Sequence, residues 1–142
     1  MREWATGAGI DETQLRAISD GVIHHGRALP QSLGGQAEPI ACAVMEDGKL
    51  IGGATGRTEF QRLFVNYLWI DEPWRGTGLG AQALRKLEEL AIERGCKDAL
   101  IETLVDDTAA WYSRCGYELI AHLPRYCGEQ TSRYTLLKSF SR

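Results

Sequence analysis

The sequence predicts an α/β (α+β) protein with a mixed, mostly antiparallel central sheet flanked by helices. Two observations lead to this fold class. Asp47-Gly48 stands between two apolar runs, which is a strong signal for a β-hairpin. Between residues 63 and 104, a strand, a glycine turn, a helix and a second strand follow one another, and such a crossover makes its two strands parallel. The 142 residues are expected to form one domain, 1–142, that buries about two thirds of the extended chain's surface.

The first expected element is an amphipathic helix. Asp11 and Gln14 have the spacing of a capping box at a helix start. Apolar residues then repeat on one face, at Leu15, Ile18, Val22 and Ile23. The helix is expected to run to about Leu29, because Pro30 stops it. Residues 31–39 follow as a loop with two glycines, a candidate rim over a substrate pocket.

An antiparallel meander is expected next. Its three strands should run from Ile40 to Met45, from Leu50 to Thr58 and from Leu63 to Ile70, because each segment is apolar and rich in strand formers. The middle strand carries glycines at positions 52, 53 and 56. Glycine inside a strand marks a close approach, here against a helix or a ligand.

The third strand leads into a glycine-rich turn, Arg75-Gly76-Thr77-Gly78-Leu79-Gly80. Pro73 ends the strand, because proline cannot donate a hydrogen bond to a β-ladder. A helix follows directly, with apolar residues at three- and four-residue spacing, and Gly95 ends it. The first amides of that helix lack helical acceptors, and the helix dipole makes its start electropositive. With Arg75 they predict an anion site that suits a phosphate or pyrophosphate.

The C-terminal part continues the sheet. Residues Ala99–Leu104 form a buried strand, and Asp106-Asp107-Thr108 can cap a short helix, Ala109–Cys115, that ends at Gly116. Two more strands are expected at residues 117–123 and 134–138, joined by a loop.

The composition excludes several kinds of partner and site. The net charge of −3 creates no field that attracts nucleic acid or anionic lipid, so neither is an expected partner. No apolar run approaches the ~20 residues needed to span a bilayer, and the N-terminus does not open a signal peptide. Four scattered cysteines without a Cys-x-x-Cys pair indicate reduced thiols in the cytoplasm, with no metal site.

Two motifs resemble the GNAT superfamily of acetyl-CoA-dependent N-acetyltransferases. The turn at 75–80 fits the family's (Gln/Arg)-x-x-Gly-x-(Gly/Ala) signature, and the preceding Leu-Trp-Ile-Asp-Glu resembles its fourth strand. Independently, Trp111-Tyr112-Ser113-Arg114-Cys115-Gly116-Tyr117 resembles the family element aromatic-Tyr-x-x-x-Gly-(Phe/Tyr). The resemblance covers about residues 40 to 140. It implies a GNAT-like sheet in which the parallel strand pair splays apart.

The resemblance also implies site residues. The pantetheine arm of acetyl-CoA would pair with the strand before the turn, and the pyrophosphate would bind at the turn. The residues expected at this cofactor site are Leu68, Trp69, Ile70, Arg75, Gly76, Thr77, Gly78, Leu79 and Gly80. Tyr112 matches the tyrosine that often protonates the leaving thiolate, and a phenol with a pKa near 10 can protonate a thiolate whose conjugate acid has a pKa near 8.5.

The implied reaction is direct transfer of acetyl to a primary amine of a small molecule or peptide, through a tetrahedral intermediate that a backbone N–H near Ile70 stabilises. An alkylammonium is less than ~1% neutral at pH 7, so a general base helps. The candidates are Glu59, Asp71, Glu102 and Asp106, or a water relayed from one of them. Where family members often carry an asparagine after the fifth strand, this chain has Asp106-Asp107-Thr108.

Two other readings compete with this one. Gly76-x-Gly78-x-x-Ala81 satisfies a loose dinucleotide-binding pattern, but five residues separate the strand end at Ile70 from the first glycine, and too little chain follows for a doubly wound oxidoreductase. A non-catalytic acyl-CoA sensor on the same fold would keep the turn and could dispense with Tyr112. A homodimer through the C-terminal strands is a further family-level expectation.

Overall fold

The computed structural model of this chain describes residues 1–27 and 36–140, and its contacts divide the chain into two units, Met1–Gly35 and Gln36–Arg142. The first unit holds a short 3-10 helix, η1 (Gly7–Gly9), and helix α1 (Glu12–Arg27). The capping box is present, because the Gln14 N–H donates to Asp11 Oδ1 at 2.8 Å and the Asp11 N–H donates to Gln14 Oε1 at 3.0 Å. The helix end expected near Leu29 and the loop at 31–35 lie outside the described residues.

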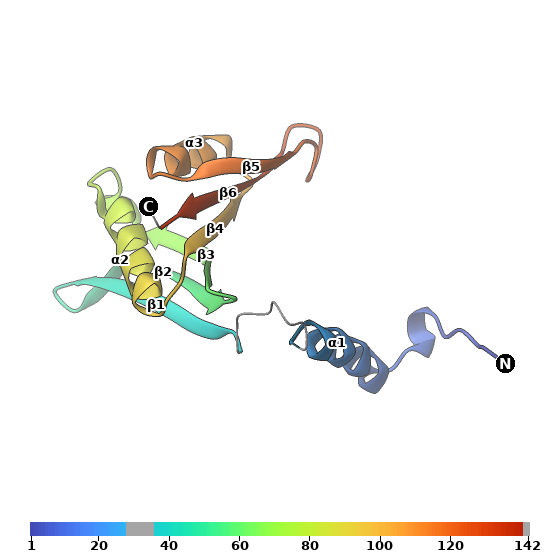
Figure 1. The fold of residues 1–142 in the computed structure, drawn as a ribbon. Helices are drawn as coiled ribbons and strands as arrows, with labels where there is room; N and C mark the ends of the chain where they lie inside the picture. Colours follow the sequence, from blue (N-terminus) through green and yellow to red (C-terminus); the bar gives the residue numbers. More distant parts are fainter. Residues whose placement is uncertain (28–35, 141–142) are drawn as a thin grey trace. The chain divides into compact units, whose positions relative to one another are not determined.

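The second unit is built on one six-stranded sheet with the strand order β1-β2-β3-β4-β6-β5 (Figure 1). The strands are β1 (Glu38–Glu46), β2 (Lys49–Glu59), β3 (Arg62–Ile70), β4 (Asp98–Thr103), β5 (Glu118–Leu123) and β6 (Arg133–Ser139). Strands β3 and β4 pair in parallel, and the other neighbours in this sheet pair antiparallel. The predicted fold class is therefore confirmed, and a doubly wound dinucleotide-binding sheet is excluded.

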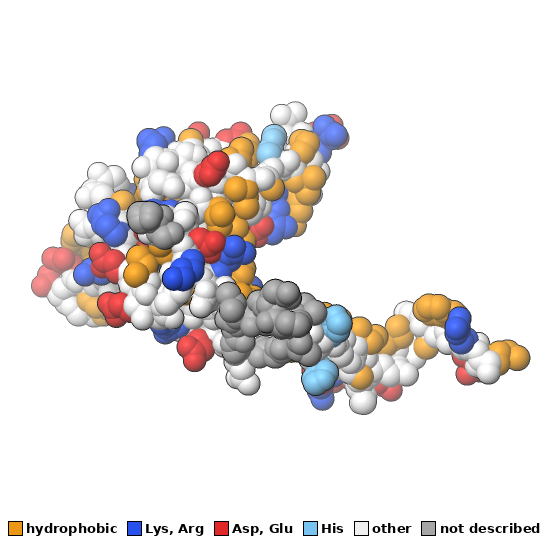
Figure 2. Space-filling model, viewed as in Figure 1, with side chains coloured by type: hydrophobic (Ala, Val, Ile, Leu, Met, Phe, Trp, Pro, Cys, Tyr) orange, Lys and Arg blue, Asp and Glu red, His pale blue; other side chains and the backbone are white. Residues whose placement is uncertain are grey.

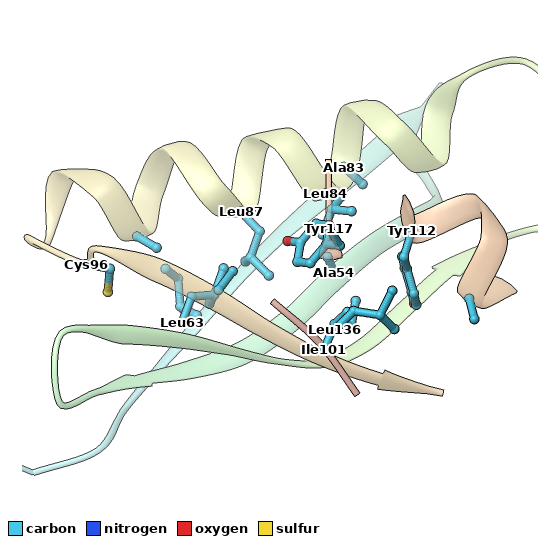
Figure 3. Packing of buried hydrophobic residues seen from close by; sticks show 14 residues of the cluster. Ala54, Leu63, Ala83, Leu84, Leu87, Cys96, Ile101, Tyr112, Tyr117 and Leu136 are labelled. Atoms are coloured by element: carbon cyan, nitrogen blue, oxygen red, sulfur yellow. The ribbon is translucent and has the colours of Figure 1, made fainter. Parts of the chain in front are cut away.

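Two helices pack on this sheet (Figure 1). Helix α2 (Leu79–Glu93) lies across β1, β2 and β3, and α3 (Asp106–Arg114) packs beside β4 and β6. Leu84 and Leu87 of α2 meet Leu63 of β3 and Leu136 of β6 in the core (Figure 3). Among the described residues these four are the largest fully buried side chains, and the burial of each stabilises the fold by roughly 1.5–3 kcal/mol.

The glycines of β2 serve the sheet itself. A Cβ at Gly56 would lie 2.2 Å from the Phe64 carbonyl oxygen, and one at Gly53 would lie 2.4 Å from that of Cys42. The close approach predicted for these positions therefore exists, but the backbones of the neighbouring strands make it, where the sequence had suggested a helix or ligand. Position 56 adjoins a register shift in the β2–β3 ladder.

The parallel pair is short. Its register comprises Arg62 with Asp98, Leu63 with Ala99 and Phe64 with Leu100, and beyond this point β3 and β4 no longer pair. The Arg62 guanidinium donates two hydrogen bonds to the Asp98 carboxylate, at 2.7 and 2.9 Å, at the paired end. From residue 65 onward the edge of β3 is therefore open on its β4 side.

Helix α3 begins earlier than the sequence suggested. Val105 occupies the N-cap position without a side-chain cap, and Asp106 and Asp107 lie in the first helical turn, where carboxylates suit the helix dipole. The helix still ends beside Gly116, whose φ of 100° favours glycine.

The surface carries mixed charge. Figure 2 shows acidic and basic side chains interspersed over the described residues of the face in view. Among the helices of residues 1–27 and 36–140, none is long and apolar enough to cross a membrane.

Candidate active site

The open edge of β3 presents main-chain groups in alternation. The Asp71 N–H donates to the Ile51 carbonyl of β2 at 2.8 Å, so residues 69 and 71 direct their backbone groups toward β2. Those of Leu68 and Ile70 consequently point to the open edge. Of the three strand residues expected to contact pantetheine, Leu68 thus directs its N–H and C=O to the open edge, and Ile70 directs its N–H there while its C=O accepts from Arg75. Trp69 directs its backbone groups toward Gly53 of β2.

The turn after β3 places the start of α2 beside this edge. Gly76 and Gly78 have φ values of 78° and 86°, conformations that other residues adopt only with strain. The first helical hydrogen bond runs from Gln82 N–H to the Gly78 carbonyl, so the amides of Leu79, Gly80 and Ala81 have no helical acceptor. The positive end of this 15-residue helix therefore carries free amides, which is the local geometry on which the predicted anion site depends.

Arg75 and Thr77 stabilise the turn. The Arg75 Nε donates to the Ile70 carbonyl at 2.7 Å, which holds the guanidinium against the strand end and leaves its terminal nitrogens available. The Thr77 hydroxyl donates to the Trp74 carbonyl at 2.7 Å, so this side chain closes the turn. The Trp111 ring of α3 lies 3.6 Å from where a Cβ at Gly80 would be, in ordinary van der Waals contact.

Tyr112 projects from α3 toward the sheet and belongs to the core cluster (Figure 3). The residue is 7% exposed, and its ring packs against Trp111 and Tyr117 with centroid distances of 5.4 and 6.0 Å. Within the described part of the chain its hydroxyl has no hydrogen-bond partner. Burial, and after it the nearby Cys115, raises the pKa of Tyr112 above its ordinary value of 10.0, so the phenol keeps its proton at neutral pH.

The neighbouring Tyr117 is different. Its hydroxyl donates to Glu88 Oε2 at 2.7 Å, and Glu88 is also bound by Lys138 Nζ at 2.9 Å. Lys138 in turn donates to the Cys115 carbonyl at the end of α3. This buried network joins α2, α3 and β6. Burial and the Glu88 carboxylate raise the pKa of Tyr117 far above its ordinary range.

A cavity of about 460 Å³ opens where β3 and β4 part. Its lining consists of Arg57, Phe64, Val65, Asn66, Tyr67, Leu100 and Glu102. The side chains of Phe64, Leu100 and Glu102 alternate with the buried Leu63, Ala99 and Ile101 that face the helices. The cavity therefore lies on the sheet face opposite α2.

Four carboxylates were candidates for the general base. Of these four, Glu102 lines this cavity. Its Oε2 accepts from the Thr135 hydroxyl at 3.0 Å, and its Oε1 accepts from Arg133.

The other three candidates have different environments. Asp71 accepts from the Glu72 N–H at the start of a 3-10 helix, η2 (Glu72–Trp74), and lies 3.7 Å from Lys49. Asp106 accepts from the Tyr134 hydroxyl at 2.6 Å, and Glu59 lies 3.6 Å from Arg57 Nε.

Sequence reasoning missed the residues that surround Glu102. Arg133 and Thr135 lie on β6, more than thirty positions away, and Arg57 enters the cavity from β2. The only local signal was the period of two along each strand, which places alternate residues on one face. Within residues 1–27 and 36–140, no three His, Cys, Asp or Glu side chains gather as metal ligands.

Comparison with known proteins fits this geometry. The sequence model of the acetyltransferase (GNAT) family matches residues 11–117. The chain is 34% identical over 118 residues to blasticidin-S acetyltransferase of Streptomyces morookaense, covering 80% of this chain and 87% of that protein. The crystal structure of an acetyltransferase from Bacillus cereus superposes with a TM-score of 0.87 at 25% identity, covering 98% of both chains. An aminoglycoside 6'-N-acetyltransferase complexed with coenzyme A shares the fold, with a TM-score of 0.67 at 16% identity over 74% of each chain.

The mixed sheet with one short parallel strand pair has the fold of acyl-CoA-dependent transferases. The chain belongs to the GNAT family of acetyltransferases. It is an acyltransferase, and acetyl-CoA is its co-substrate.

Proposed function

We propose that this enzyme transfers acetyl from acetyl-CoA directly to a primary amine of a small molecule, within a complex that holds both substrates. The observation that carries the proposal is the parting of β3 and β4 after Phe64 and Leu100. The anion-binding start of α2 lies on one face of the sheet at this point, and the polar cavity lies on the other. Two substrates can therefore reach one point from opposite faces. The relatives named for blasticidin-S and aminoglycosides support a small-molecule amine.

The residues at the first face fit acetyl-CoA. The N–H and C=O of Leu68 would pair with an extended pantetheine arm, as an added strand pairs with a sheet edge, and the Ile70 N–H would lie beside the thioester. The free amides at the start of α2 and the terminal nitrogens of Arg75 would hold the pyrophosphate. When bound, acetyl-CoA supplies a thioester, which activates the acetyl group toward an amine.

The chain's own groups would then move two protons. We assign the cavity between β3 and β4 to the amine substrate and call it the acceptor cavity. Glu102 lines it and would take a proton from the substrate's ammonium group, so that the neutral amine can attack. The Ile70 N–H points to the open edge, where it can donate to the developing oxyanion. Tyr112 holds its proton at neutral pH and would give it to the departing sulfur. The nitrogen, now bonded to the acetyl carbon, would lose its second proton to solvent, and the Tyr112 phenolate would regain one from solvent. No cysteine nucleophile is needed in this scheme.

Gly78→Ala is expected to weaken acetyl-CoA binding. Gly78 is the N-cap of α2 with a φ of 86°, and a side chain there costs about 1–2 kcal/mol in the left-handed region. Relief of that strain would reorient the amides that hold the pyrophosphate. Calorimetric titration with acetyl-CoA measures the change in Kd.

Gly95→Ala is the matched control for this experiment. Gly95 has a φ of 90° just beyond the other end of the same helix, away from the anion site. This variant should lose similar stability in thermal unfolding and bind acetyl-CoA as the wild type does. Equal affinities for Gly78→Ala and the wild type would contradict the placement of the pyrophosphate.

The proposed function is tested by thermal unfolding and thiol release. Acetyl-CoA at ~100 times its Kd should stabilise the protein by about 2.7 kcal/mol, a shift of several degrees in Tm, while NADH and NADPH should give none. A panel of small-molecule amines should then release CoA thiol. Stabilisation by acetyl-CoA without thiol release from any amine, peptide amines included, would contradict amine transfer and favour the sensor reading.

Two further predictions concern the setting of the enzyme. The four cysteines are free thiols, at positions 42, 96, 115 and 127, which supports a reducing compartment, and we place the enzyme in the cytoplasm. A homodimer through the C-terminal strands stays a prediction.

A further inference from the structure

The acceptor cavity carries a cation as well as a carboxylate. Arg57 lies on β2 directly across from Phe64 of β3, and its guanidinium carbon is 4.0 Å from the centroid of the Phe64 ring. Stacking on an aromatic face holds a guanidinium in place without using its hydrogen-bond donors. The side chain is 43% exposed, and its Nε forms an ion pair with Glu59 Oε1 at 3.6 Å, which leaves the two terminal nitrogens outside this contact.

The donors of Arg57 are available to a ligand. Across residues 1–27 and 36–140 its guanidinium makes no hydrogen bond, although it lines the cavity. Its planar set of five N–H donors matches a carboxylate in two-point contact. A cavity of about 460 Å³ has the size of a small-molecule site, and it is too small for a folded partner.

Glu102 forms the other charged wall. From Arg57 the sheet runs through Phe64 to Leu100, and Glu102 follows two residues further along β4. With strands about 4.8 Å apart and a rise of about 3.3 Å per residue, the backbone positions of Arg57 and Glu102 are about 12 Å apart. A molecule that carries its amine and a carboxylate several bonds apart can contact both walls at once.

We propose that the acceptor is a zwitterion: Glu102 receives its amine, and Arg57 binds a carboxylate of the same molecule. Arg57 is thus a residue that determines specificity, and the substrate class is small amines bearing a carboxylate. This inference rests on the proposed function, because it assigns the cavity to the acceptor.

Matched pairs of amines test the inference. Each pair is an acid and its amide: lysine and lysinamide, β-alanine and β-alaninamide, and longer ω-amino acids with their amides. The assay measures kcat/KM by thiol release at saturating acetyl-CoA. The acid of the best pair should exceed its amide by about ten- to a hundredfold, as expected for one charge-assisted hydrogen-bonded contact. Arg57→Gln should collapse this ratio toward one, and Arg57→Lys should retain part of it.

Lys97→Gln is the control, because it removes one exposed positive charge outside the cavity and should leave the ratio unchanged. Equal use of acids and amides by the wild type would overturn the inference while the proposed function stands. An acid-to-amide ratio of kcat/KM that is unchanged in Arg57→Gln would also overturn the inference. So would a protein that acetyl-CoA stabilises and that acetylates amides but none of the acids. Failure of acetyl-CoA to stabilise the protein would instead reject the proposed function.

Discussion

Tyr112→Phe is expected to lower kcat by about a hundredfold to ten-thousandfold, the range typical of losing a general acid. The variant should remain as stable as the wild type or become slightly more stable. The reason is that Tyr112 is only 7% exposed and its hydroxyl has no partner in the described residues, and an unpaired hydroxyl in such a site destabilises a fold by about 1–3 kcal/mol. Activity and stability should therefore change in opposite directions. Thiol-release kinetics and thermal unfolding measure the two effects.

Tyr117→Phe is the matched control. Tyr117 is similarly buried in the same cluster, but its hydroxyl donates to the buried Glu88. Its removal should cost about 1–3 kcal/mol of unfolding free energy, because it deprives a buried carboxylate of a donor. If Tyr112→Phe keeps full kcat, Tyr112 is a core aromatic and the proton donor is another group.

The pH dependence of the rate follows from the direction of the Tyr112 pKa. A proton donor is active while protonated, and burial raises the pKa of Tyr112 above 10.0. Loss of rate through Tyr112 should thus appear only as pH rises through this raised value. A fall in kcat below pH 10 that disappears in Tyr112→Phe would contradict the direction.

Glu102→Gln carries the second large effect, a fall in kcat of about a hundredfold to ten-thousandfold near neutral pH. Glutamine fills the same space and can still bond with Thr135, but it cannot take a proton. The deficit should shrink as pH approaches the ordinary amine pKa of about 10.4, because the acceptor then loses its proton in solution. The pH profile of kcat/KM for wild type and variant measures this recovery.

Asp106→Asn is the comparison for Glu102→Gln. Asp106 is also a carboxylate near the end of β4, but its partner is the Tyr134 hydroxyl and it does not line the cavity. Only a small change in kcat is expected. An equal loss in both variants would mean that Glu102 is not the base, as would a Glu102→Gln deficit that persists at high pH.

The sequence predicted what local chemistry determines. The Asp47-Gly48 hairpin, the glycine turn before α2 and the end of α2 at Gly95 all depend on residues that are close in the chain, and all are present. The position of Tyr112 on α3 followed from a motif. The absence of a partner for its hydroxyl among residues 1–27 and 36–140 did not, since pairing depends on which distant elements pack around it.

The acceptor cavity could not be predicted from the sequence, because it depends on the register between β2 and β3. Strands β2 and β3 are joined at Phe60 and Gln61, both with positive φ, 57° and 58°, and neither is a residue that signals such a turn. Because the sequence does not signal this turn, it does not predict the register that places Arg57 beside Phe64. Likewise, Arg133 reaches Glu102 only because β6 pairs with β4, a connection between segments thirty residues apart.

Initial-rate kinetics with acetyl-CoA and the best amine both varied test the central claim most directly. In the proposed mechanism the two substrates approach one gap between β3 and β4 from opposite faces, so both must be bound before transfer. Double-reciprocal plots should therefore give lines that intersect. Parallel lines would show that an acetylated enzyme forms before the amine binds, and would contradict direct transfer.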